Sequence, residues 1–395
     1  MHPRGSRFVV LLLLTGCSVL QPAAVVPDAG SDSSLAPVPA TDQLDLLVVF
    51  DNGGYGWQTA SHLQRHLSRV VEILATGDRE GDGLRDFEPV RSLHLGVVTA
   101  DVGAGAVIDA RCRPRGDDGV LRTAVTYPFR CDVDDFLPAF PDRVFSYDRA
   151  GALSAAEVGL DAACVLYDPA LDTRGCYIQS PLEAALRATA LSPRPDGSSP
   201  VTWTAAGYRP PTFPDGTSGH GDDPGTNGAF LRPDSVLAIW IVSAKDDCAS
   251  PNPRLFSDDA EFASVPTGLR CLSFRDQLYP TDRYVRGVLG LRASPSRLVY
   301  AVWAGVPEAV SGSTPTAILA HPDMELGIDA HGSDIRDGCN GPGNYAAPAV
   351  RMTTVARDIL GAGGRASVHS ICSGDDQPAT DAFLDEVILA LAGTP

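Results

Sequence analysis

The chain has 395 residues and carries 31 Lys and Arg against 49 Asp and Glu, for a formal net charge of −18 and an isoelectric point near 4.7. An acidic surface repels phosphate groups, so the composition argues against a nucleic-acid partner and makes Ca²⁺ or Mg²⁺ the natural counter-ion. Residues 43–395 are numerous enough for one α/β domain with long insertions.

The N-terminus has the pattern of an export signal. Arginines precede an apolar run at 8–14, which is shorter than the about 20 residues of a membrane-spanning helix. The sequence Leu-Thr-Gly-Cys that ends at Cys17 resembles the lipobox of bacterial lipoproteins. This resemblance implies a signal peptide at 1–16 and acyl chains on Cys17, and Ser18 favours the outer membrane. An ordinary signal peptide with a chance cysteine is the alternative.

Residues 17–42 are rich in Ala, Pro, Ser and Asp and show no apolar periodicity. Such a segment buries too little apolar surface to offset its chain entropy, which predicts a flexible tether. We therefore expect an exported protein that is anchored by lipid to a membrane of the bacterial cell envelope, with its domain at 43–395.

Apolar strands alternate with amphipathic helices along this domain. The run 44–50 is apolar at almost every position and predicts a parallel strand buried on both faces. The predicted strands are 44–50, 93–99, 235–242, 297–306 and 366–371, and the predicted helices are 59–74, 155–163, 181–191, 347–360 and 381–392. This alternation predicts an α/β fold with a doubly wound, mostly parallel sheet and helices on both faces. The expected insertions are about 102–150, 192–232, 248–296 and 307–346.

The chain has nine cysteines, and without Cys17 their number is even. Exported proteins meet an oxidising compartment, so we expect the remaining cysteines to form disulfides. Proximity in the sequence suggests the pairs Cys112–Cys131, Cys164–Cys176, Cys248–Cys271 and Cys339–Cys372. A zinc site is the alternative, but the chain has no CxxC or CxxxxC motif.

Polar residues follow three of the predicted strands, where ligands bind in doubly wound sheets. They are Asp51, Asp101 and the run from Ser243 to Asp247. Together with the segments LHLGVVTADVGAG, GCYIQSPLEAAL, RPDSVLAIWIVSAKDDC and SIC, this pattern resembles a von Willebrand factor A domain, and more narrowly the cysteine-stapled A-domain lipoproteins of myxobacteria. The resemblance covers most of residues 42–393.

The resemblance implies a Mg²⁺-dependent adhesion site with the pattern DxSxS after the first strand. Asp51 is present, but Gly53 and Tyr55 occupy the two serine positions and Ala244 the acidic position after the strand 235–242. Ser180 corresponds to the threonine of the family. Mg²⁺ requires several oxygen ligands, so we expect a degenerate site. The alternative is a metal site rebuilt by the nearby carboxylates, which are Asp101, Asp246 and Asp247.

A second acidic segment lies between the first predicted helix and the second strand. Its carboxylates and Gly83 have the spacing of the start of an EF-hand calcium loop, but Pro89 replaces the last ligand. The candidate ligands are Asp78, Glu80, Asp82, Asp86 and Glu88. A solvated acidic turn without Ca²⁺ is the alternative.

The sequence contains no GxSxG, HExxH or Walker motif and no GxGxxG after a strand. His62 and His66 have metal-ligand spacing on one helix, but without an acidic companion we interpret them as part of a solvated helix face.

The leading hypothesis is therefore a non-enzymatic, lipid-anchored binding module that presents its strand-end face and loop 192–232 to a protein or glycan. The alternatives are an envelope hydrolase with a divalent metal on Asp51, Asp101 and Asp246, and a structural envelope protein stabilised by Ca²⁺ at the acidic turn.

Overall fold

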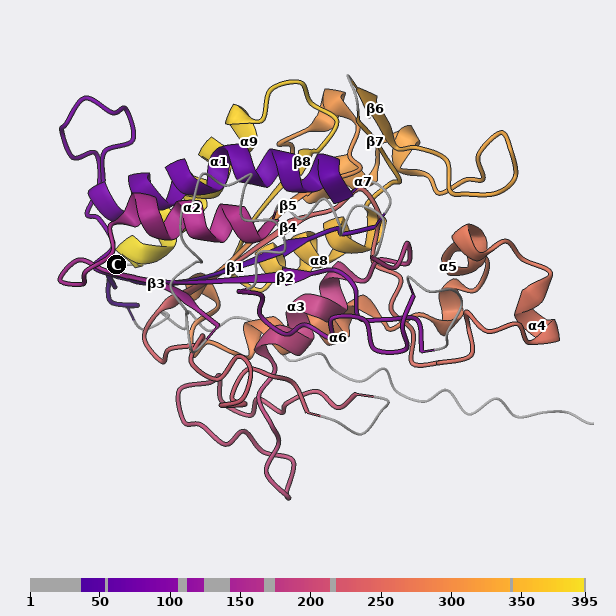
Figure 1. Cartoon of the computed structure of the whole chain (residues 1–395), viewed down its shortest axis with the longest axis horizontal. Coiled ribbons are helices and arrows are strands. Elements are labelled where there is room, and N and C mark those ends of the chain that lie inside the picture. Colours follow the sequence, from indigo (N-terminus) through magenta and orange to yellow (C-terminus); the bar gives the residue numbers. More distant parts are fainter. Residues whose placement is uncertain are drawn as a thin grey trace, which may run out of the picture. The chain divides into compact units, whose positions relative to one another are not determined.

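A six-stranded sheet crosses the centre of the described part of the protein (Figure 1). Its strands run in the order β3-β2-β1-β4-β5-β8. All neighbouring pairs are parallel except β2 with β3, which are antiparallel. The strands are β1 (Gln43–Phe50), β2 (Ser92–Thr99), β3 (Phe145–Asp148), β4 (Val236–Val242), β5 (Leu298–Ala304) and β8 (Arg365–Ser370).

The computed structural model describes residues 37–53, 56–105, 112–123, 143–166, 175–213, 218–341 and 344–393, with only the backbone at 56–60. Residues 37–395 form one unit. The predicted signal peptide, the lipidation site Cys17 and most of the predicted tether lie outside the described residues, as do Tyr55 and Cys131. Within the described ranges, no helix has the length and apolar character needed to cross a membrane.

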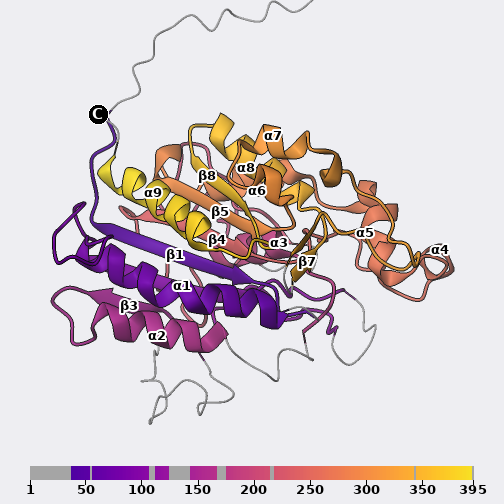
Figure 2. The same ribbon diagram turned by 90° about the horizontal axis from the view of Figure 1, so that it is seen from above.

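Helices cover both faces of the sheet. Figures 1 and 2 show α1 (Gly56–Thr76), α2 (Ala155–Leu166) and α9 (Gln377–Ala392) on one face. The opposite face is covered by α3 (Pro181–Thr189), α6 (Thr281–Leu289) and α8 (Val350–Gly361). The predicted α/β class, with a mostly parallel sheet and helices on both faces, is confirmed.

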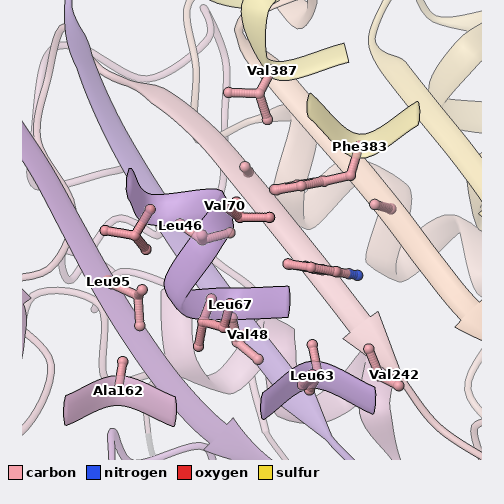
Figure 3. Close-up of a cluster of buried hydrophobic side chains, with 14 of the residues drawn as sticks. Leu46, Val48, Leu63, Leu67, Val70, Leu95, Ala162, Val242, Phe383 and Val387 are labelled. Carbon is pink, nitrogen blue, oxygen red and sulfur yellow. The ribbon is translucent and has the colours of Figure 1, made fainter. Parts of the chain in front are cut away.

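The period of two along β1 explains this layering, because successive side chains of a strand point to opposite faces. Leu46 and Val48 pack with Leu67 of α1 and Phe383 of α9 (Figure 3). The alternate residues Leu47 and Val49 belong to the core beneath α3 and α8. Every residue of β4 and β5 is buried, which accounts for their uninterrupted apolar sequences.

Short elements that the sequence analysis did not predict fill the insertions. β3 lies in the predicted insertion 102–150 and ends the sheet at one edge. The nine-residue helix α6 lies in the predicted insertion 248–296 and was not predicted either. The other short elements are α4 (Ala260–Ala263), α5 (Arg270–Ser273), α7 (Pro315–Leu319) and the hairpin β6 (Cys339–Gly341) with β7 (Asn344–Ala346). Single 3₁₀ turns occur at Thr267–Leu269, Arg275–Gln277, Pro295–Arg297, Glu308–Val310 and Pro322–Met324. Each is too short to give a periodic signal in the sequence.

The disulfides agree only partly with the expected pairing. Cys248–Cys271 and Cys339–Cys372 are present as predicted. Cys112 bonds to Cys176 across 64 residues, so the predicted pairs Cys112–Cys131 and Cys164–Cys176 are wrong. The segment before α3 returns to the end of β2, where the Ser180 amide donates to the Ala100 carbonyl at 2.8 Å. Tertiary structure thus brings these two cysteines together; Cys164 is buried in α2.

The amino end of β1 contains a buried ion-pair network. Asp45 is 0% exposed and accepts hydrogen bonds from Arg232 Nε at 2.7 Å and Arg292 Nη2 at 3.0 Å. The Arg232 amide and the Ser235 hydroxyl also donate to Asp45. Burial lowers the pKa of Arg292 to about 10, and the attraction of Asp45 opposes that shift. Both carboxylate oxygens of Asp45 have donors, which is the condition for burying a charge.

Candidate functional site

A cavity of about 410 Å³ lies at the carboxyl ends of β1 and β4. These strands are neighbours, but β1 leads to β2 on one side and β4 leads to β5 on the other, so the cavity is at the topological switch point where doubly wound sheets bind ligands. Its polar lining includes Asp51, Gln179, Lys245, Asp246, Asp247, Arg275, Asp334 and Arg351. Its apolar lining includes Ile178, Leu272, Leu278, Leu326, Ile335 and Val350.

The walls of this cavity come from two of the predicted insertions. Residues 267–278, which include α5, form one wall, and the Cys248–Cys271 disulfide ties that wall to the chain after β4. Leu326, Asp334 and Ile335 form another wall. Figure 1 shows α5 beyond the ends of the sheet strands. By contrast, none of the described residues of loop 192–232 lines the cavity, and that loop ends at the opposite, amino end of β1 through Arg232.

Asp51 is buried at the base of the cavity, with 1% of its surface exposed. Its Oδ1 accepts a 2.7 Å hydrogen bond from the Gly53 amide. The Ser243 hydroxyl is 3.5 Å from Oδ2 but also donates to the Lys245 carbonyl at 2.7 Å, and it has only one proton to give. Burial raises the pKa of Asp51, although the Gly53 amide and the charge of Lys245 oppose that shift. Asp51 is therefore a buried carboxyl group held by donors from its own turn and from the turn after β4.

Gln179 supplies an unsatisfied acceptor in the same cavity. Its side chain is 1% exposed, Nε2 donates to the Cys176 carbonyl, and Oε1 has no partner. Exchanging the amide atoms would place two oxygens against each other, so this contact fixes the amide orientation. A Cβ at Gly53 would lie 3.0 Å from Gln179 Nε2 and 3.1 Å from Asp51 Oδ1, so glycine permits the two polar groups to converge. The sequence analysis did not identify Gln179.

Asp246 and Asp247 serve as caps of two helices. Asp246 accepts from the amides of Arg351 and Met352 at 2.8 and 3.2 Å, at the start of α8. Asp247 accepts from the amides of Leu182 and Glu183 at 3.0 and 3.2 Å, at the start of α3. Burial raises the pKa of Asp246 to about 6, and the Arg351 amide opposes that shift. These carboxylates satisfy orphan amides at positive helix ends.

Asp101 and Ser180 lie beside the cavity without lining it. Asp101 accepts from the amides of Gly103 at 2.8 Å and Cys176 at 3.4 Å, and burial raises its pKa to about 6. Ser180 lines a separate cavity of about 290 Å³ together with Arg115 and Glu183. Of the predicted metal ligands, the cavity therefore brings together only Asp51, Asp246 and Asp247. Among the described residues, no three His, Cys, Asp or Glu side chains are arranged to hold a metal ion.

Two basic groups of the cavity are paired. Lys245 Nζ is 2.7 Å from Asp334 Oδ2. Arg351 Nη2 is 3.3 Å from Asp247 Oδ1 and donates to the Tyr279 carbonyl at 2.6 Å. The positive charge of Lys245 also opposes the effect of burial on the pKa of Asp51.

The acidic turn at 77–88 is closed by its own backbone. Asp78 accepts from the amides of Gly81, Asp82 and Gly83 at 2.6 to 3.2 Å. These hydrogen bonds, that of Gly83 foremost, lower the pKa of Asp78. Asp86 accepts from the Arg79 amide at 2.7 Å, and the Arg79 side chain pairs with Asp381 and Asp385 of α9. The other predicted calcium ligands are Glu80, Asp82 and Glu88. In the described ranges, which include this turn, no group of three or more His, Cys, Asp or Glu residues has an arrangement that could hold a metal ion.

His62 is buried, so its interpretation as part of a solvated face is wrong. Its Nδ1 is 2.7 Å from Asp376 Oδ2, and its Nε2 accepts from the Asn344 amide at 2.6 Å. His66 Nε2 lies 3.5 Å from the same carboxylate. Burial opposes the shift, but hydrogen bonds from His62, His66 and Arg65 together lower the pKa of Asp376. The carboxylate beside the two histidines is Asp376, which is so far away in the sequence that the spacing of residues could not reveal it.

Comparisons with protein-family models, curated proteins and solved structures found no match to this chain.

Proposed function

We propose that this protein is a non-catalytic binding module of the von Willebrand factor A type, anchored by lipid to the bacterial cell envelope, that binds a protein partner through its strand-end cavity. The observation that carries the proposal is the cavity at the switch point, which is lined by the buried carboxyl group of Asp51 and by Gln179, whose buried Oε1 has no partner. Buried polar groups usually have partners, so the unsatisfied amide oxygen of Gln179 points to a ligand that supplies a donor.

The fold class supports the family resemblance. Asp51 follows the first strand of a mostly parallel sheet, and the order of the strands reverses there. The adhesion site is degenerate because Gly53 and Ala244 provide no side-chain oxygen, and Asp246 and Asp247 cap helices instead. A binding role therefore fits the cavity better than metal-dependent hydrolysis on Asp51, Asp101 and Asp246.

The lining of the cavity favours protein over glycan. Apolar side chains from Ile178, Leu272 and Leu326 form much of its wall, and apolar burial is the main gain when a side chain enters a pocket. The Cys248–Cys271 disulfide fixes one wall, which reduces the entropy lost on binding. The lipid on Cys17 keeps the module at the membrane, and two or more acyl chains give stable anchoring.

Site-specific photo-crosslinking in the producing bacterium tests this proposal. A benzoyl-phenylalanine at Leu272, on the cavity wall, should give one discrete adduct with an envelope protein. The matched control is the same residue at Leu389, which is 49% exposed on α9. The adduct at position 272 should disappear when Asp51→Asn is added. Equal adducts at both positions, or none at 272, would contradict the proposal.

The anchor has a separate test. Cys17→Ala should abolish metabolic labelling with radioactive palmitate and move the protein from the detergent phase to the aqueous phase. Labelling that persists in this variant would contradict lipidation at Cys17.

A further inference from the structure

We infer that the partner inserts a cationic side chain with an apolar stem, a lysine or an arginine, into the strand-end cavity and places its head group between Asp51 and Gln179. This inference rests on the proposed function and names the chemistry that the site recognises. In effect, the ligand itself supplies the positive charge at the place where the resemblance would put a metal ion.

Hydrogen bonding requires a ligand that donates. Gln179 Oε1 is an acceptor without a partner, and beside it Asp51 is a buried carboxyl group whose donors are the Gly53 and Ala244 amides and the shared Ser243 hydroxyl. Both side chains line the cavity, and both lie next to Gly53. A guanidinium or ammonium group carries several N–H donors and no acceptor, so one head group satisfies both residues. A carboxylate ligand would place acceptor against acceptor.

Charge balance selects a cation among the possible donors. Lys245 is paired with Asp334, Arg351 with Asp247, and Asp246 with the amides at the start of α8. Arg275 lies on the exposed rim of the cavity. Asp51 is a buried carboxyl group that lines the cavity beside Gln179, and a buried carboxylate gains most from a charged donor. The net charge of −18 also attracts cationic partners over longer distances.

The apolar part of the lining is the reason to expect an apolar stem on the ligand. The lining of the cavity includes Ile178, Leu272 and Val350 together with Asp51. Lysine and arginine side chains bury their methylene groups against apolar surface while the head group keeps its polar contacts. A hydrophilic ligand without such a stem would leave this wall in contact with water.

Binding of four probes with short alkyl chains to the purified domain, residues 37–395, tests this inference; these residues form one unit. The probes are n-butylguanidinium, n-butylammonium, n-butanol and butyrate, each titrated by NMR. The two cations should bind at least tenfold more tightly than n-butanol, and butyrate should bind least. Asp51→Asn should weaken cation binding at least tenfold and leave n-butanol binding unchanged. Gln179→Met, which keeps the volume and removes the acceptor, should weaken cation binding several-fold.

The control is Asp82→Asn, which removes the same charge from the exposed acidic turn and should leave all four affinities unchanged. Gln179→Met keeps the test decisive if Asp51→Asn does not fold. The inference is overturned if n-butanol or butyrate binds as well as the cations, or if both cavity variants retain cation binding. A crosslink at position 272 with no preference for cations would overturn this inference and leave the proposed function standing.

Discussion

Two buried aspartates at opposite ends of β1, Asp45 within the strand and Asp51 directly after it, differ in the surroundings of their carboxylates. Asp45, at the amino end, receives donors from Arg232, Arg292 and Ser235. Asp51, at the carboxyl end, accepts from the Gly53 amide and lines a cavity. The first carboxylate lies in a closed network and the second is open to a ligand. Burial alone therefore does not mark a functional carboxylate, whereas burial at the wall of a cavity does.

Breaking the closed network should have the largest effect. Asp45→Ala leaves Arg292, 1% exposed in its side chain, as an uncompensated buried charge. We expect the free energy of unfolding to fall by about 3–5 kcal/mol, as for other buried pairs that lose one partner. Urea denaturation of the domain measures this loss. A loss below about 1 kcal/mol would contradict a structural role for Asp45.

Removing the disulfide that holds one wall of the cavity should have the second-largest effect on stability. Replacing both Cys248 and Cys271 by alanine opens a loop of sequence separation 23 and should lower the free energy of unfolding by about 3 kcal/mol. Probe binding at the cavity should weaken as well, because residues 267–278 form its wall. Replacing Cys339 and Cys372, which lie outside the cavity lining, should cost similar stability with less effect on the probes. Equal loss of binding in both double variants would argue against a specific role for this wall.

The free energy of unfolding should depend on pH through two buried aspartates that follow β2 and β4. Burial raises the pKa of Asp101 and of Asp246 to about 6, from an unfolded value of 3.8. The folded state therefore holds these protons more tightly, so stability is greatest below about pH 4 for these groups and is lost as pH rises through about 6. Each group should contribute about 1–3 kcal/mol to this loss. Asp101→Asn should flatten the dependence, measured as urea midpoints between pH 4 and 7; an unchanged slope would contradict it.

Asp51→Asn should have the smallest effect on stability. It removes a buried charge and keeps an oxygen acceptor for the Gly53 amide, so we expect a change within about 1 kcal/mol of zero. The same urea denaturation at pH 7 measures it beside Asp45→Ala. A destabilisation of about 3 kcal/mol or more would place Asp51 with Asp45 as a structural residue.

Much of the fold was predictable because its signals are local. The apolar runs ending at Phe50 and Val242 had the composition of strands buried on both faces, and their predicted bounds differ from the observed ones by one residue. β3 was missed because it is a four-residue edge strand without a continuous apolar run. The Cys112–Cys176 pair was missed because it depends on the return of the chain to the end of β2.

The site was predictable only in its location. The rule that ligands bind at the carboxyl ends of parallel strands placed Asp51 and Asp246 correctly in one cavity. It gave no information on hydrogen-bond partners, so the capping roles of Asp246 and Asp247 and the unsatisfied amide of Gln179 required coordinates. The interpretation of the histidine pair on α1 was wrong for the same reason, because its carboxylate partner, Asp376, lies far away in the sequence.

The pairing of Lys245 with Asp334 has a practical consequence. This is the only lysine in the sequence, so the protein has a single ε-amino group, and that group lies on the cavity wall. Acylating reagents for primary amines would therefore modify one side chain, and the rate of its modification would report directly on whether the cavity is occupied. The single lysine is thus a natural chemical probe beside the proposed binding site.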